Sequence, residues 1–252
     1  LARKTLERIV SQASATETMV NIITTIDHNA TGGIARISRE IMANVILMGW
    51  PQRGPVLDRI IGERTATIIE SIDKTLLICH LSKALVAHKR IIVACPPLAE
   101  KENGFENWLS KIVKLAQELS LPLHFFCDPK TQLSIQRQLS KQPVSNHFEL
   151  FEDWDDFLVL TKEVGPNDIF VLVSARKGSA SYLPILDNLP NKLEKHLATN
   201  SRIIIYPQQY LPEYINEQNH TQLHGPVTKG LETIQNLGKG LADIFRGGDE
   251  GV

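Results

Sequence analysis

Apolar runs alternate with amphipathic stretches along most of the chain, and this alternation predicts strands and helices in turn. Short apolar runs without polar interruption are typical of strands that are buried on both faces of a parallel sheet. Such runs predict strands at Met19–Ile26, Asn44–Met48, Thr75–Cys79, Arg90–Cys95, Leu123–Cys127, His147–Phe151, Asp168–Ser174 and Arg202–Tyr206. Apolar residues at helical spacing predict helices at Leu1–Ser14, Ala30–Met42, Val56–Ile72, Glu106–Ser120, Lys130–Ser140, Asp153–Glu163 and Ser179–Ala198.

The order of these elements predicts an α/β fold with tandem doubly wound parallel sheets. Residues 90–206 give five strands alternating with helices, which is the pattern of one complete doubly wound unit. The preceding residues match only the last part of such a unit, so the first unit is incomplete at its N-terminus. The expected domains are a partial unit at 1–82, a linker at 83–89, a complete five-stranded unit at 90–207 and a polar tail at 208–252. Because the chain starts at Leu1 and not at Met, we expect a piece of a longer polypeptide.

The tail contains one further candidate helix, at residues 230–247. Its apolar residues fall on one face, although two glycines weaken the helix. One interpretation is a helix packed on its own domain, and the other is a segment that docks on a partner or on a membrane surface. The apolar residues are Leu231, Ile234, Leu237, Leu241, Ile244 and Phe245.

Composition excludes several classes of partner. Hydrophobic residues make up 42% and charged residues 22%, and the net charge of -1 gives no general attraction to nucleic acid. Aromatic residues are only 6% and are not interleaved with a basic stripe, which also argues against a nucleic-acid partner. The three cysteines lie in or beside apolar strand-like runs without metal-ligand spacing, which predicts reduced core thiols and a cytosolic compartment.

No motif for catalysis is present in the sequence. It has no Gly-x-Ser-x-Gly, no Walker loop and no dinucleotide fingerprint, and no pair of its eight histidines has zincin or zinc-finger spacing. Asp27 and His28 are either an acid–base pair or, respectively, a helix cap and an exposed ring. The sequence therefore predicts a chain that is not an enzyme, with no metal site and no cofactor.

Two turns are placed where a ligand would bind. In open parallel sheets, ligands bind at the carboxyl ends of strands, and glycine turns there expose backbone N–H groups that favour anions. One turn follows the strand at 44–48 and the other follows the strand at 168–174. At the first of them, the strand ending in Leu-Met-Gly, the turn with Arg53 and Gly54, and Gly62 resemble a universal stress protein domain, of the adenine nucleotide alpha hydrolase-like fold.

Nucleotide-binding members of that family carry Gly-x2-Gly-x9-Gly-(Ser or Thr) at this point. Gly49 and Gly62 match the first and third glycines, but Gln52 and Glu63 stand at the other two positions. The Gln52 side chain would fill the space of a phosphate, and the Glu63 carboxylate would repel one. The second turn is further from the motif, since its four positions hold Ser174, Lys177, Asp187 and Asn188, while Cys95 and Pro96 replace the aspartate that follows the family's first strand.

A weaker anion-binding role is still open for the two turns. Their residues could meet ATP or a cyclic dinucleotide, or they could be solvated loop residues. The candidate ligand-binding residues are Gly49, Arg53, Gly54, Gly62, Arg176, Lys177, Ser179 and Ser181.

Tandem units with degenerate motifs resemble the soluble C-terminal domain of a monovalent cation:proton (Na+/H+) antiporter. This resemblance implies a non-catalytic regulatory domain at the cytoplasmic face of the cell membrane, with the transmembrane antiporter domain upstream of Leu1. It also implies a homodimer, and edge-to-edge pairing of the last strands of the two units. Two alternatives are a soluble universal stress protein that binds ATP or a cyclic dinucleotide, and an assembly module that acts through the helix at 230–247.

Overall fold

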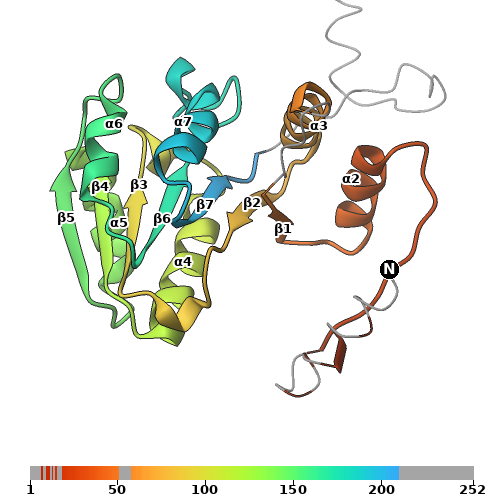
Figure 1. Cartoon of the computed structure of the whole chain (residues 1–252), viewed down its shortest axis with the longest axis horizontal. Coiled ribbons are helices and arrows are strands. Elements are labelled where there is room, and N and C mark those ends of the chain that lie inside the picture. The colour runs from red at the N-terminus through yellow and green to blue at the C-terminus, as the bar shows by residue number, and fades with distance from the viewer. Residues whose placement is uncertain are drawn as a thin grey trace, which may run out of the picture. The chain divides into compact units, whose positions relative to one another are not determined.

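Seven strands pair into one sheet within the described part of the chain (Figure 1). The computed structural model describes residues 7, 10, 11, 13, 15, 19–50 and 58–209, with backbone alone for 58–64. Most of the predicted helix at Leu1–Ser14, the turn residues Gln52, Arg53 and Gly54, and the tail from residue 210 with its helix at 230–247 lie outside these ranges.

The strands are β1 (Val45–Gly49), β2 (Thr75–His80), β3 (Arg90–Ala94), β4 (Leu123–Cys127), β5 (Asn146–Leu150), β6 (Asp168–Val173) and β7 (Ser201–Tyr206). The helices are α2 (Ala30–Glu40), α3 (Asp58–Ser71), α4 (Phe105–Leu119), α5 (Pro129–Leu139), α6 (Phe157–Leu160) and α7 (Leu189–His196). Single 3-10 turns lie at Leu85–Ala87, Ala99–Lys101, Thr161–Glu163 and Pro184–Asp187.

The strand order is β1-β2-β7-β6-β3-β4-β5, and one junction differs from all the others. Every neighbouring pair is parallel except β2 and β7, which pair antiparallel with Leu76 opposite Tyr206 and His80 opposite Arg202. The expected edge-to-edge pairing of these two strands is therefore confirmed. As a consequence, the carboxyl ends of β1 and β2 lie at the end of the sheet where β3 to β7 begin.

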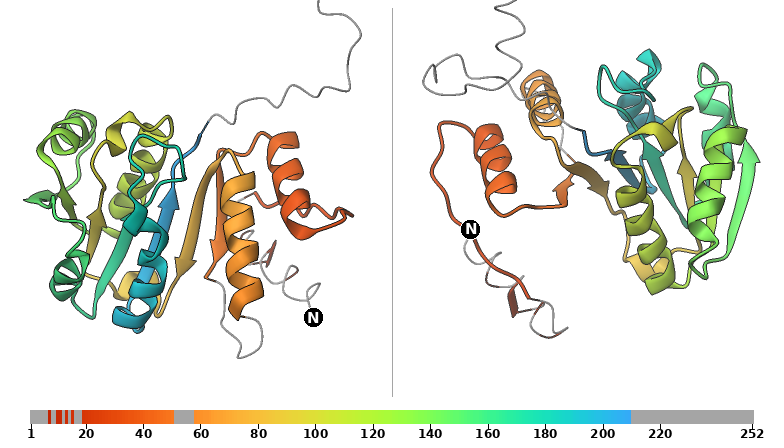
Figure 2. Two further views of the ribbon diagram at one scale, coloured as in Figure 1. Left: turned by 90° about the horizontal axis from the view of Figure 1, so that it is seen from above. Right: turned by 180° about the vertical axis from the view of Figure 1, so that it is seen from behind.

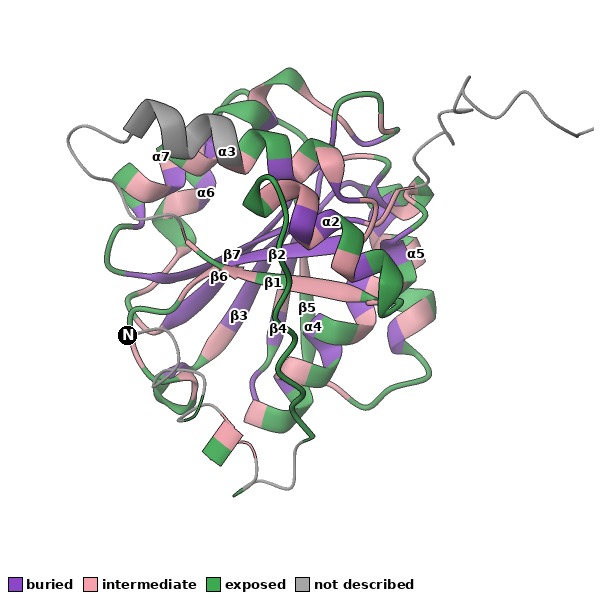
Figure 3. Ribbon diagram, turned by 90° about the vertical axis from the view of Figure 1, so that its right-hand side faces the viewer, coloured by how far each residue is buried: buried purple, intermediate pink, exposed green. Residues whose placement is uncertain are grey.

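Helices cover both faces of the sheet and bury two apolar clusters (Figure 2). On one face, α4 and α5 contribute Trp108, Ile112 and Ile135 to the first cluster. On the other, α3, α6 and α7 pack on the second cluster, of which Ile72, Phe157, Leu189 and Leu193 are members. The central strands are buried throughout, as Figure 3 shows, which explains why they read as unbroken apolar runs.

The predicted strand at Met19–Ile26 is wrong. These residues have no regular secondary structure, and Met19 and Ile26 are 90% and 96% exposed. An apolar run becomes a strand only where a neighbouring strand accepts its backbone hydrogen bonds, and this segment pairs with none. β-Branched composition alone therefore overestimated the number of strands.

Helix α3 runs through Gly62 without a break. Two other helices differ from the prediction. The helix expected at Ser179–Ala198 reduces to a 3-10 turn and α7, each with a proline in its first turn. The helix expected at Asp153–Glu163 forms only as α6 and a 3-10 turn.

The described residues belong to one compact unit. The tandem organisation and the domain boundaries at 82 and 89 thus stay predictions. Within the described ranges, no helix combines the length and apolarity that a membrane span requires.

Candidate functional site

The two predicted ligand turns lie at opposite ends of the strands of the sheet. Gly49 ends β1, and the next residue, Trp50, donates its backbone N–H to the Cys79 carbonyl at 2.7 Å. Arg176 follows β6, whose direction is opposite to that of β1 because β2 and β7 are antiparallel. The sheet therefore separates Gly49 from the residues after β6, while Gly62 lies within α3.

Arg176 is turned into the protein. Arg176 is only 5% exposed. Its guanidinium donates hydrogen bonds to three backbone carbonyls. Nε donates to Ile69 at 2.7 Å, Nη2 donates to Lys74 at 3.0 Å, and Nη1 donates to Pro207. Burial lowers the pKa of Arg176 to about 10. These contacts connect the end of α3, the start of β2 and the end of β7, so Arg176 joins the two parts of the sheet.

The strand order reverses between β3 and β6, and a carboxylate lies at this point. Glu102 follows the 3-10 turn after β3, and its Oε1 accepts from the backbone N of Ser181 at 2.8 Å and from Ser181 Oγ at 2.7 Å. This is the position at which ligands enter open α/β sheets. A carboxylate that already holds both donors would repel a phosphate placed there.

The chain after β7 covers the same place, at the carboxyl ends of β3 and β6. Gly104 lies so close to Gln208 that an added Cβ would overlap the Gln208 backbone nitrogen. The next residue, Gln209, donates its backbone N–H to the Asp73 carbonyl at 2.9 Å and its Nε2–H to Ser179 Oγ. Segments of the chain itself therefore contact one another at the switch point, where ligands enter open α/β sheets.

Lys177, another of the predicted residues, faces solvent. Its Nζ lies 3.9 Å from Asp187 Oδ2, and both side chains are well exposed. Lys177, Ser179 and Ser181 were predicted as candidates from the sequence, whereas Glu102, which no motif marks, was not. Gly104 was the available signal, because a glycine before a helix can indicate close backbone approach.

A separate cavity of about 570 Å³ lies between α2, β1 and the extended segment before α2. Its walls are mainly apolar and include Ile23, Ile34, Ile37, Ile41 and Val45.

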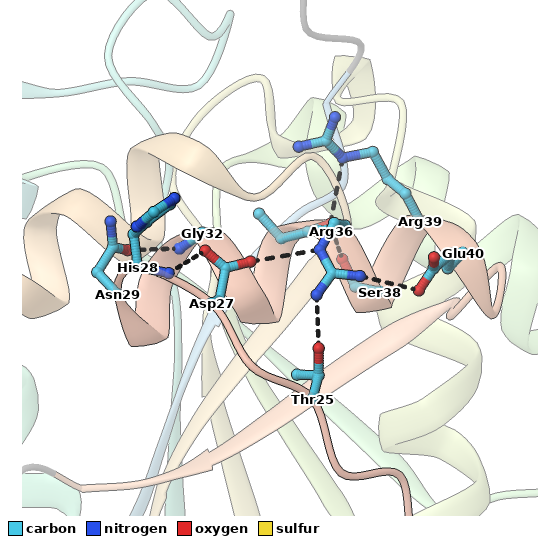
Figure 4. Close-up of polar contacts among 10 residues, drawn as sticks. Thr25, Asp27, His28, Asn29, Gly32, Arg36, Ser38, Arg39 and Glu40 are labelled. Carbon is cyan, nitrogen blue, oxygen red and sulfur yellow. Dashed lines mark hydrogen bonds and ion pairs between the residues drawn. The ribbon is translucent and has the colours of Figure 1, made fainter.

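Asp27, which lines this cavity, belongs to a group of polar contacts around Arg36 (Figure 4). Arg36 donates to Asp27 Oδ2 at 3.3 Å, to Glu40 Oε2 at 3.4 Å and to Thr25 Oγ1 at 2.5 Å. The hydrogen bond from Arg36 lowers the pKa of Asp27. Asp27 Oδ1 accepts from the backbone N of His28 at 2.8 Å, and Asn29 caps α2 through Gly32. The contacts of Asp27 are therefore those of a carboxylate that orders the segment before α2.

Comparisons with known proteins place the fold. No protein-family model matches the sequence, and no curated protein sequence matches it. A universal stress protein from Archaeoglobus fulgidus has a similar structure, with a TM-score of 0.54 at 10% identity over 82% of this chain and 76% of the other. The cytoplasmic domain of a prokaryotic cation chloride cotransporter gives a TM-score of 0.53 at 14% identity over 80% and 78%. At these identities the likeness shows the fold alone, which is a parallel-dominated α/β sheet of the universal stress protein type.

Proposed function

We propose that this chain is a non-catalytic regulatory domain at the cytoplasmic face of a membrane ion transporter, specifically a monovalent cation:proton antiporter. The observation that carries the proposal is that the chain's own side chains bind one another at the switch point between β3 and β6. There, Glu102 binds Ser181, and Gln209 binds Ser179. A domain whose own side chains bind one another at this point is suited to act through contacts with other parts of a protein.

The structural comparison also supports a role within an ion transporter. The cytoplasmic domain of a cation chloride cotransporter has this fold, so the fold occurs attached to an ion-transporting protein. The join between β2 and β7 further supports a unit that transmits contacts, because Arg176 and five facing residue pairs connect its two parts. A rigid, continuous sheet passes a displacement at one edge to the other.

The reading frame upstream of Leu1 gives the first test. The proposal predicts about a dozen apolar helices of roughly 20 residues each, the length that spans a bilayer. A start codon close to Leu1, with no such helices before it, would overturn the proposal.

Ion flux gives the second test. In membrane vesicles that contain the full-length protein, we expect removal of residues 1–252 to change the cation dependence of proton flux while flux itself continues. A full-length Lys177→Met protein is the matched control, since Lys177 is exposed and makes only a long ion pair. Identical cation dependence with and without residues 1–252 would contradict a regulatory role.

A further inference from the structure

We propose that His124, His147 and Glu149 form a zinc site on the last two strands of the sheet. His124 on β4 lies directly opposite His147 on β5, and Glu149 lies two residues further along β5. Side chains two apart on a strand share a face. The ligand atoms of the three side chains consequently all lie within 4.8 Å of one another. The proposal is independent of the transporter role.

Two of the ligand atoms already have the spacing that zinc requires. Nε2 of His124 lies 3.3 Å from Oε2 of Glu149. Two ligands bound tetrahedrally at the usual zinc distances of roughly 2.0–2.1 Å are separated by about 3.3 Å. The His147 ring lies close to the same point, with its centroid 4.6 Å from that of His124 at an interplanar angle of 72°. Small rotations of exposed side chains would complete the set.

His124 is the fixed member of the site. Its ring stacks on Phe126 with centroids 4.8 Å apart. Its Nε2 is buried and has no hydrogen-bond partner of good geometry. A buried nitrogen without such a partner costs free energy unless something else binds it. His147 and Glu149 are exposed and free to adjust.

Arg90 holds the metal-free tautomer of His124, so zinc binding has to displace one contact of Arg90. Its Nη1 lies 3.2 Å from Nδ1 of His124, and because a guanidinium can only donate, Nδ1 accepts and the ring proton is on Nε2. Zinc at Nε2 requires this proton to move to Nδ1, and Arg90 Nη1 then gives up its contact. Arg90 remains anchored through Nη2, which donates to Asp168 Oδ2 at 2.7 Å and to the Glu163 carbonyl at 3.0 Å.

The charges and ligand types favour zinc. The carboxylates of Glu149 and Asp168 outnumber the single guanidinium of Arg90 within this group, which favours a bound cation. Two imidazoles and one carboxylate are ligands that suit zinc, and water would take the fourth position because β5 is an edge strand with exposed side chains.

Titration of the metal-free full chain with zinc, followed by competition with a chromophoric chelator, tests the site. We expect one tight equivalent, and we expect His147→Ala and Glu149→Gln each to weaken it at least tenfold. Both substitutions are at exposed positions, so circular dichroism should be unchanged. His196→Ala is the matched control, because His196 is an exposed histidine on α7 and not on β4 or β5.

Cobalt in place of zinc reports the geometry of the site. We expect the visible absorption of tetrahedral cobalt in the wild type and in His196→Ala, and its loss in His147→Ala. The proposal is overturned by the absence of a tight zinc equivalent, by equal affinity in all variants, or by an equal loss in His196→Ala.

Discussion

The guanidinium carbon of Arg202 lies 4.3 Å from the centroid of the Trp50 ring, so a cation–π contact reaches from β7 to the residue after β1. Arg202 is buried, and its Nη1 donates to the Leu197 carbonyl at 3.0 Å. Burial lowers the pKa of Arg202. This contact spans β2 where β7 begins, while Arg176 connects the start of β2 with the end of β7 at the opposite end of these strands.

Replacing Trp50 should weaken this connection. Cation–π contacts contribute about 0.5–2 kcal/mol from exposed to desolvated sites, so Trp50→Leu should lower the free energy of unfolding by an amount in this range. Trp50→Phe keeps an aromatic face and should lose less. Urea denaturation followed by circular dichroism measures both variants. Equal unfolding midpoints for the Leu and Phe variants would show that the ring contributes only by its apolar area.

Arg176→Lys should destabilise the chain more strongly. An ammonium cannot reach the carbonyls of Ile69, Lys74 and Pro207 together, and hydrogen bonds to charged groups contribute about 1.5–3 kcal/mol each. We expect a loss of about 3 kcal/mol in unfolding free energy. The neighbouring Lys177→Arg is the control and should stay within about 0.5 kcal/mol, since exposed ion pairs contribute little. Similar effects at both positions would argue against the connecting role of Arg176.

ATP should give no binding heat with the wild-type chain at millimolar ligand. The Glu102 carboxylate holds the donors of Ser181 and would repel phosphates. Isothermal titration calorimetry with ATP, and then with cyclic dinucleotides, measures this. Glu102→Gln removes the charge and keeps an acceptor for Ser181. ATP binding by this variant would show that charge repulsion excludes ATP from the wild type, and no binding would show that the chain itself occupies the space. A saturable ATP signal in the wild type would support the nucleotide-binding alternative.

Cys79 should make stability depend on pH above about 9. Burial raises the pKa of the Cys79 thiol to about 11. A thiol in the unfolded chain ionises with its ordinary pKa of 9.0, whereas the folded thiol stays protonated to higher pH. The stabilisation is complete below pH 9 and is lost as pH rises towards 11, by about 1 kcal/mol at pH 10. Urea unfolding of the wild type and Cys79→Ala at pH 8, 9 and 10 measures it, and a constant difference between the two would contradict the shift.

Strands were predictable because their burial is a local property of the sequence. β3, β4 and β6 lie within one residue of the predicted bounds, since each is an apolar run closed by polar residues or proline. Met19–Ile26 has the same composition and is not a strand, because pairing depends on a neighbour that the segment itself does not encode.

The partners of the candidate site residues could not be predicted in the same way. Arg176 binds a carbonyl 107 residues away, and Ser181 binds a carboxylate 79 residues away. The glycine spacing identified the turns, but the direction of each strand decides which turns lie at the same end of the sheet. The edge-to-edge pairing of β2 and β7 followed from the family resemblance, whereas its antiparallel direction is seen only in the structure.

That pairing also changes the role of the peptide connection between β2 and β3. The segment around Val86, which is exposed, is a covalent tether between strands that are already held by the β2–β7 ladder and by Arg176. Cutting the chain at Val86 would therefore leave two complementing fragments that stay associated. The smaller fragment would supply two strands of a sheet whose other five come from the larger one.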